Sequence, residues 1–129
     1  MAITVFLVDD NRTFLAAADA ALSTISGVTV IGHAVCGVDA LAKIEALRPD
    51  VVLLDIGLPD ISGIEVGLQL GTWNTPPHIV FVSLLDRAGY SGLEQEVGAF
   101  GFVDKGDFVT ELLPIMTAFT EAPARGTHK

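Results

Sequence analysis

The sequence has few of the residues that cross-link small proteins or bind zinc. It contains one cysteine, Cys36, which cannot form an internal disulfide, and it has no CxxC or CxxH spacing typical of zinc sites. Long apolar runs are also missing, although the mean hydropathy is +0.56. The richest stretch, residues 79–85, is far shorter than the ~20 residues of a membrane-spanning helix. No basic region precedes the first apolar run, as it would in a secretory signal. These absences predict a soluble, cytoplasmic protein that does not contact membranes.

Basic residues are scarce as well. Seven lysines and arginines stand against sixteen acids, and the formal net charge is therefore 7 − 16 = −9. An acidic surface repels phosphate backbones, and no basic cluster offsets it, so we expect no direct nucleic-acid binding by this segment. Half of the 129 residues are hydrophobic, which is enough to bury a core and too many for a disordered chain. The composition predicts one compact domain.

Short apolar runs alternate with stripes of helical spacing along the chain. The runs predict five strands, at residues 3–8, 28–35, 51–54, 79–82 and 100–104. The stripes predict five helices, over about 11–25, 37–47, 62–70, 86–97 and 110–119. Strands that alternate with helices form parallel sheets covered by helices on both faces, so the fold class is expected to be α/β.

Several helix details follow from local chemistry. Asp10 or Asn11 can cap the first helix, and Ser26 with the glycine after it should end that helix. Pro114 predicts either a late start of the last helix, near Thr110, or a kink. The second helix is expected to turn three residues inward, Leu41, Ile44 and Leu47. The last helix should bury one stripe, Phe108, Leu112, Met116 and Phe119.

Polar residues stand where the apolar strands end. Ligands of open parallel sheets bind beyond the carboxyl ends of the strands. Those ends carry five polar residues, Asp9, Asp10, Asp55, Ser83 and Lys105. Taken singly, each could be a helix cap, a turn former or a solvated surface residue. Because all five fall at the same edge, we expect them to converge on one site.

The converging side chains suit phosphoryl chemistry. Three carboxylates in one crevice repel one another unless a cation joins them, and oxygen ligands without Cys or His favour Mg²⁺ over zinc. One carboxylate can then act as a nucleophile toward phosphorus. Lys105 can supply an ammonium group and Ser83 a hydroxyl group to the phosphoryl oxygens. The set predicts a phospho-acceptor site.

Four sequence blocks identify a family. They are the acid pair in FLVDDN, the block RPDVVLLDIGLPDISG, the serine after IVFV, and GAFGFVDKG with its lysine. Over residues 3–119 the chain resembles the response-regulator receiver domain of two-component systems. The resemblance implies a flavodoxin-like (βα)5 fold with strand order 2-1-3-4-5. It also implies a receiver domain over residues 1–120, followed by a flexible tail or truncated linker at 121–129.

The resemblance assigns roles to the site. Asp55 would accept a phosphoryl group from a sensor histidine kinase or a phosphotransfer protein. Asp10 would bind Mg²⁺ directly and Asp9 through water, with the backbone carbonyl of Gly57 as a further ligand. Ser83 and Lys105 would hold the phosphoryl oxygens. The chain would catalyse no reaction other than its own phosphorylation and dephosphorylation.

The resemblance also implies a switch. Phe102 occupies the place of an aromatic residue that turns inward on activation, into space that Ser83 vacates. The output surface would comprise the fourth helix, the fifth strand and the fifth helix, and it includes Tyr90. It would bind the chain's own output domain, a downstream protein or a second phosphorylated copy.

Three residues depart from the family pattern. Leu84 replaces the usual small residue after the serine, and Gly106 replaces the usual proline after the lysine, as in receivers fused to LuxR-type output domains. Gly57 offers no side chain. Leu84 would narrow the gap through which water reaches the phosphoryl group, and neither Leu85 nor Gly57 has a side chain that could orient this water. Loss of phosphate from Asp55 would therefore be slow. The alternative is that Leu84 only packs against the fourth helix.

Two other functions compete with this interpretation. A haloacid-dehalogenase-type phosphatase also uses an aspartate after its first strand, but it needs a second acid two residues later, where this chain has Asn11. A pseudo-receiver would bind partners without ever carrying phosphate. Such proteins usually lack an acid or the lysine, and here none is missing.

Overall fold

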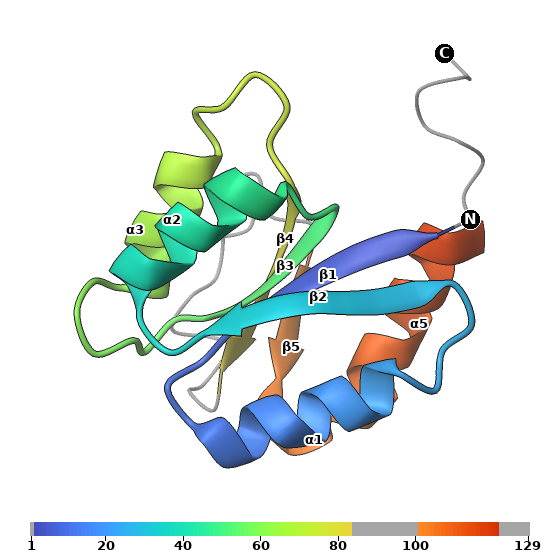
Figure 1. Ribbon diagram of the computed structural model, residues 1–129. Helices are drawn as coiled ribbons and strands as arrows, with labels where there is room; N and C mark the ends of the chain where they lie inside the picture. Colours follow the sequence, from blue (N-terminus) through green and yellow to red (C-terminus); the bar gives the residue numbers. More distant parts are fainter. Residues whose placement is uncertain (1, 84–100, 122–129) are drawn as a thin grey trace.

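The structure is a computed structural model that describes residues 2–83 and 101–121 (Figure 1). Five parallel strands form one sheet in the order β2-β1-β3-β4-β5, which confirms the predicted topology. The strands are β1 (Ile3–Val8), β2 (Val28–Ala34), β3 (Val51–Asp55), β4 (His78–Ser83) and β5 (Gly101–Asp104). The described helices are α1 (Arg12–Leu22), α2 (Gly37–Leu47), α3 (Gly63–Leu70), the short 3-10 helix η2 (Lys105–Asp107) and α5 (Phe108–Glu121).

Helices cover both faces of the sheet. α1 and α5 lie on one face, and α2 and α3 lie on the other (Figure 1). Successive side chains of a strand point to opposite faces, so each strand contributes to two separate cores. In β3, Leu53 packs with α1 and α5, whereas Leu54 packs with α2 and α3. The alternation explains why nearly every residue of the central strands is apolar and buried.

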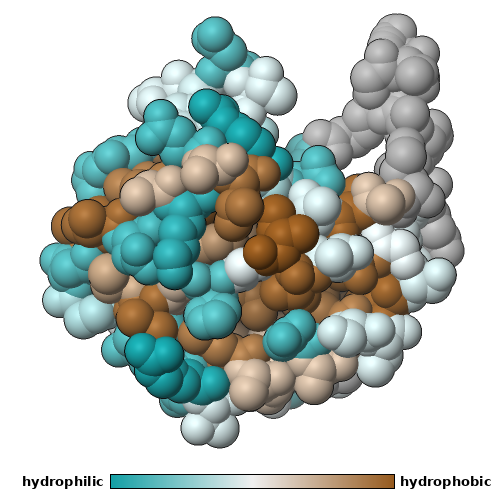
Figure 2. All heavy atoms as spheres, viewed as in Figure 1, coloured by the Kyte–Doolittle hydropathy of each residue, from teal (hydrophilic) through white to brown (hydrophobic). Residues whose placement is uncertain are grey.

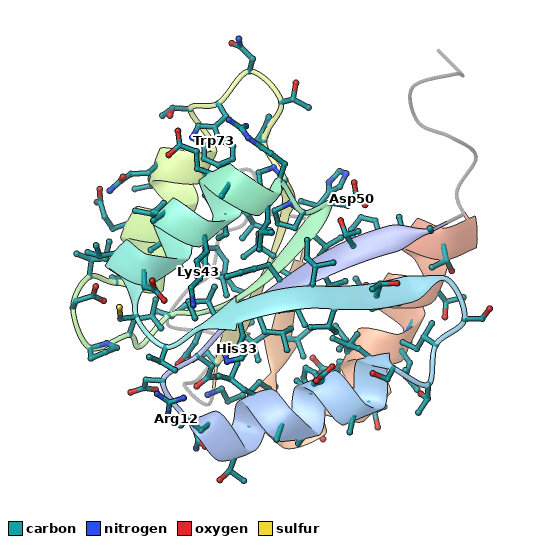
Figure 3. All side chains as sticks on the ribbon, in the orientation of Figure 1. Arg12, His33, Lys43, Asp50 and Trp73 are labelled. Atoms are coloured by element: carbon teal, nitrogen blue, oxygen red, sulfur yellow. The ribbon has the colours of Figure 1, made fainter. Side chains whose placement is uncertain are left out.

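The strand register aligns the carboxyl ends that were predicted to carry the site. Val8 pairs with Leu54, so the residue after β1 lies beside the last residue of β3. Asp55 in turn pairs with Val82, and Ser83 pairs with Asp104. Asp50 and Trp73 lie at the opposite end of the sheet (Figure 3), where the Arg48 guanidinium group lies 4.2 Å from the centre of the Trp73 ring.

The first helix begins as predicted and ends earlier. Asn11, and not Asp10, is its cap: Asn11 Oδ1 accepts a hydrogen bond of 3.1 Å from the Phe14 backbone N–H. The helix stops at Leu22 instead of near Ser26. The hydroxyl groups of the next two residues donate to carbonyl oxygens of the last turn, Ser23 to Asp19 and Thr24 to Ala21. These side-chain bonds compete with helix propagation, which accounts for the early end.

The prediction that Leu47 faces the core is wrong, because Leu47 is 45% exposed. α2 buries Ala40 and Ile44 instead, while Leu41 is partly buried. Leu47 lies over the edge strand β2 beside Gly32, and beyond an edge strand there is no further sheet to cover it. Its side chain lines an apolar patch between α2 and β2 with Ile31, and apolar side chains are visible there in Figure 2.

The last helix also starts earlier than expected. α5 begins at Phe108, directly after η2, and continues through Pro114. The ring of a proline removes one helical hydrogen bond, to the carbonyl four residues earlier, here that of Thr110. Both residues are exposed, so water can bond that carbonyl. The predicted stripe is confirmed: all four of its members are buried, namely Phe108, Leu112, Met116 and Phe119.

Some predictions fall outside the described residues. These are the helix at 86–97, the departures at Leu84 and Leu85, and Tyr90. α5 extends to Glu121, one residue into the predicted tail, and the rest of that segment also lies outside the description. Within residues 2–83 and 101–121, every helix is too short or too polar to cross a membrane.

Candidate functional site

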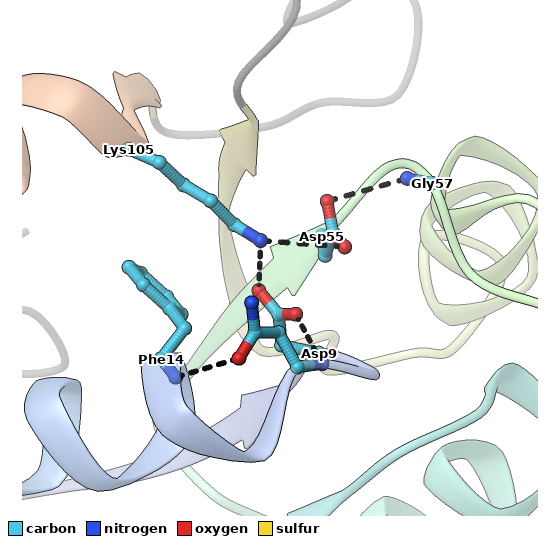
Figure 4. A network of polar contacts seen from close by, with 6 residues as sticks. Asp9, Phe14, Asp55, Gly57 and Lys105 are labelled. Atoms are coloured by element: carbon cyan, nitrogen blue, oxygen red, sulfur yellow. Dashed lines mark hydrogen bonds and ion pairs between the residues drawn. The ribbon is translucent and has the colours of Figure 1, made fainter.

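Three carboxylates meet at the carboxyl edge of the sheet. Asp9 follows β1 and is 1% exposed, Asp55 ends β3 and is 6% exposed, and Asp10 is open to solvent. One oxygen atom from each lies within 4.8 Å of the others. Backbone groups orient two of them: the Asn11 N–H donates to Asp9 Oδ1 at 2.8 Å, and the Gly57 N–H donates to Asp55 Oδ1 at 3.3 Å (Figure 4).

The lysine that directly follows β5 completes the cluster. Lys105 Nζ lies 2.5 Å from Asp9 Oδ2 and 3.7 Å from Asp55 Oδ2 (Figure 4). Among the described residues, Asp9 Oδ2 accepts no well-directed hydrogen bond, and its partner is the ammonium group of Lys105. The ammonium group also lies 4.7 Å from the centre of the Phe14 ring, which packs edge-on against Phe108 at 4.9 Å. The Phe14 ring, supported by Phe108, thus lies against the lysine ammonium group beside the acids.

The surroundings raise the pKa of Asp55 above its ordinary value of 3.8. Burial is the largest cause, because it disfavours the charged carboxylate, and the negative charge of Asp9 adds to it. Lys105 and the Gly57 N–H act in the opposite direction and lower the pKa. The fold therefore makes the ionised form of Asp55 less favourable than that of an exposed aspartate.

Replacing Asp55 with asparagine is expected to stabilise the metal-free protein at pH 7, by about 1 kcal/mol or roughly 4 °C in Tm. In the wild type, the ionised Asp55 lowers the free energy of unfolding, because the pKa in the folded state lies above the unfolded pKa of 3.8. This loss of stability is complete at pH values above the folded pKa and absent below pH 3.8. Thermal unfolding of both proteins in EDTA, at pH 7 and near the lowest pH at which both still fold, measures the difference. A variant less stable than wild type at pH 7 would contradict the expectation.

Ser83 and Phe102 lie on β4 and β5, the pair of adjacent strands next to the acids. Ser83 is buried at the end of β4, one residue after the partner of Asp55. Phe102 is 7% exposed and belongs to the core beneath α2 and α3, where its ring lies 6.4 Å from that of Phe81. The structure thus brings the three acids together and pairs two of them, Asp9 and Asp55, with Lys105. It places Ser83 at the neighbouring strand end and buries Phe102 in the core on the α2 and α3 face.

Two residues with a part in the site were not predicted from the sequence: Asp60, in the loop between β3 and α3, and Gly63, the first residue of α3. Gly63 starts α3 so close to the sheet that an added Cβ would lie 2.0 Å from the Asp55 carbonyl oxygen. The carboxylate of Asp60 accepts hydrogen bonds from the N–H groups of Gly37 and Val38, at 2.7 and 2.9 Å. One feature of the sequence could have indicated the contact of Asp60. Cys36 is a poor residue at the position that caps α2, and its side chain makes no cap bond, so another group has to cap this helix.

The donor set fits Mg²⁺. All three converging side chains are carboxylates, which are hard oxygen ligands. Two of them are buried, and among the described residues Lys105 is the cation that pairs with both. Asn11, where a dehalogenase-type phosphatase needs its second acid, is used to cap α1. The arrangement can bind a divalent cation and offer one carboxylate to an electrophile. It contains no general acid two residues after Asp9.

Comparison with known proteins decides the family. The model of the response regulator receiver domain matches residues 5–116. The chain belongs to this family. Receiver domains are parts of two-component systems, they are generally not enzymes, and they bind Mg²⁺ at an acidic site.

The receiver domain has relatives in several bacteria. It is 32% identical to the response regulator GacA of Pseudomonas aeruginosa over 111 residues, which are 86% of this chain and 52% of GacA. The chain spans about half the length of GacA and of similar curated relatives such as UvrY of Escherichia coli. Part of the relatives' length thus has no counterpart in these 129 residues.

Solved receiver structures share the fold. The receiver domain of the putative response regulator NarL from Mycobacterium tuberculosis has a TM-score of 0.84 at 29% identity, covering 95% of this chain and 98% of that one. The response regulator domain of CheB from Thermotoga maritima has a TM-score of 0.81 at 25% identity, covering 95% and 100%. The predicted fold class and family are confirmed.

Proposed function

We propose that this receiver domain accepts a phosphoryl group on Asp55 from a phosphohistidine of a sensor kinase or a phosphotransfer protein, in a Mg²⁺-dependent reaction in the cytoplasm. The observation that carries the proposal is the position of Lys105, whose ammonium group lies 3.7 Å from Asp55 within a cluster of three carboxylates. The pair supplies a nucleophile together with a counter-charge for the group it receives.

Each residue of the site has a part in the transfer. Asp9, Asp10, Asp55 and the Gly57 carbonyl would hold Mg²⁺, which when bound neutralises charge on the phosphoryl oxygens. A carboxylate oxygen of Asp55 forms a bond to phosphorus as the bond to the donor's imidazole nitrogen breaks, and the imidazole leaves with the electron pair. Lys105 offsets the charge of the transferred oxygens, and the Ser83 hydroxyl donates a hydrogen bond to one of them. Lys105 also lowers the pKa of Asp55 and so favours the ionised nucleophile.

A small phosphoryl donor tests the proposal without the cognate kinase. Incubation with acetyl phosphate and Mg²⁺ is expected to add one phosphoryl group to the wild type, as measured by intact-mass spectrometry. No addition is expected with EDTA or in Asp55→Asn, which keeps the shape of the side chain and loses the nucleophile. An unmodified wild type would favour the pseudo-receiver alternative, and equal labelling of Asp55→Asn would place the acceptor elsewhere.

We further propose that phosphorylation changes the surface formed by β5 and α5 together with the segment at 86–97. Ser83 and Phe102 lie on adjacent strands, so a movement of the serine toward the phosphoryl group alters the space next to the aromatic ring. Because this chain spans only about half of relatives such as GacA, the partner of that surface is the chain's own output domain, a downstream protein or a second copy. The change is a shift between two states of the domain.

The phosphorylated protein also tests the switch. Amide NMR shifts of residues 101–104 and of α5 are expected to move on phosphorylation, or on addition of beryllofluoride, with the oligomeric state followed by light scattering. Shifts confined to Asp9, Asp10 and the loop after Asp55 would show that phosphate binds without switching this surface.

A further inference from the structure

The loop that carries Gly57 is fastened to α2 by one side chain. Asp60 accepts hydrogen bonds from the N–H groups of Gly37 and Val38, the first two residues of α2, at 2.7 and 2.9 Å. These bonds join segments 22 and 23 residues apart in the sequence. They also lower the pKa of Asp60 to about 2, so the carboxylate is ionised throughout the physiological range.

α2 depends on this contact because its own cap is missing. The preceding residue, Cys36, makes no side-chain bond to the helix. Helix N-termini leave backbone N–H groups unpaired and carry partial positive charge, which an aspartate stabilises. Asp60 supplies that carboxylate from the neighbouring loop, and Ile61 packs beside it, where a Cβ added to Gly37 would lie 2.4 Å from Ile61 Cγ1.

The remainder of the loop has local bonds only. Leu58 N–H and Gly63 N–H both donate to the carbonyl of Ile56, and Gly57 N–H donates to Asp55. Within residues 2–83 and 101–121, the segment 57–61 is hydrogen-bonded to a helix or strand other than the adjoining β3 only through the side chain of Asp60. Gly57 itself has open space on its Cβ side. Without Asp60, the segment that presents the Gly57 carbonyl would keep the core packing of Leu58 and Ile61 and lose its described hydrogen bonds to α2.

We propose that Asp60 is a positioning residue for the Mg²⁺ site: by binding the first turn of α2, it fixes the loop whose Gly57 carbonyl completes the ligand set. This inference rests on the proposed function of the Asp55 site. Groups that orient metal ligands from outside the ligand set commonly change metal affinity by about 10- to 100-fold when removed. We expect Asp60→Ala to weaken Mg²⁺ binding by about tenfold.

The test must separate positioning from helix capping. Asp60→Ala removes both, and the double variant Cys36→Ser/Asp60→Ala restores a cap to α2 from its own sequence position. Asp60→Asn removes the charge and keeps a carbonyl oxygen that can accept one of the two bonds. Asp39→Ala removes another exposed acid from the first turn of α2, one that pairs with Lys43 rather than with the loop.

Two readouts are measured on the 129-residue protein. Mg²⁺ titrations followed by amide NMR shifts give the affinity, and thermal unfolding gives Tm. Asp60→Ala is expected to lose both affinity and Tm. The double variant should recover Tm but stay weak in Mg²⁺ binding, Asp60→Asn should recover most of the affinity, and Asp39→Ala should match wild type in affinity.

The outcomes are distinguishable. Wild-type affinity in Asp60→Ala, or recovery of affinity together with Tm in the double variant, would show that Asp60 only caps α2 and would overturn the inference. If Asp60→Ala does not fold, the double variant and Asp60→Asn decide the question in the same way. A wild-type protein that binds no Mg²⁺ would instead overturn the proposed function, and this inference with it.

Discussion

Lys105→Ala is expected to slow phosphorylation of Asp55 by acetyl phosphate about 10²- to 10³-fold, the usual effect of removing one charge-stabilising group from an acyl- or phosphoryl-transfer site. The lysine side chain is only 11% exposed, so water replaces its charge poorly. Its loss also leaves Asp9 Oδ2 without its described partner, and it raises the pKa of Asp55 further. The rate is measured by intact mass at fixed Mg²⁺ and pH.

Mg²⁺ affinity provides the matching control. Lys105 competes with a divalent cation for Asp9 Oδ2, so Lys105→Ala should bind Mg²⁺ as tightly as wild type or more tightly. Lys43→Ala removes a surface lysine of α2 that pairs with Asp39, and it should leave the phosphorylation rate unchanged. Phosphorylation of Lys105→Ala at the wild-type rate would show that the lysine stabilises the unphosphorylated structure and does not accelerate phosphoryl transfer.

Gly63→Ala is expected to destabilise the fold by about 3 kcal/mol, at the upper end of the usual cost of overpacking. The added methyl group would lie 2.0 Å from the Asp55 carbonyl oxygen and 2.9 Å from the Ile56 Cα, both of them backbone atoms of the site. A backbone contact cannot rotate away as a side chain can, so α3 or the end of β3 must shift. Urea denaturation monitored by circular dichroism gives the difference in unfolding free energy.

Two glycines of the same chain serve as controls for that variant. An alanine Cβ at Gly57 meets no atom within 4 Å, and at Gly101 its nearest neighbour lies at an ordinary 3.5 Å. Gly57→Ala and Gly101→Ala should therefore stay within about 0.5 kcal/mol of wild type. A Gly63→Ala protein of equal stability would mean that α3 is not held against Asp55 as closely as the structure shows.

The sheet and its acidic edge were predictable because their signals are local. Each strand is a short apolar run, and each polar residue of the site follows its run directly, so Asp9 and Asp55 could be placed without any knowledge of packing. The strand order was available only through the family resemblance, since no local pattern states which strands are neighbours.

What escaped prediction depends on contacts between distant segments. Asp60 joins the β3–α3 loop to α2, and Gly63 lies against the peptide of Asp55. Neither residue type by itself indicates such a contact in a sequence. Leu47 has helical spacing that suits a buried position, yet the sheet ends beneath it. The early end of α1 comes from hydroxyl groups that bond the helix carbonyls, a competition that apolar spacing does not register.

The division of the interior by the sheet has a consequence for how the protein can vary. Met116 on α5 and Ile44 on α2 belong to separate cores with a layer of backbone between them. Substitutions at well-separated sites without shared partners have nearly additive effects on stability. Mutational drift on one side of the sheet can therefore be tolerated without compensating changes on the other. α5 is therefore free to diverge, while the side of the sheet that carries α2 and the loop with Asp60 stays as it is.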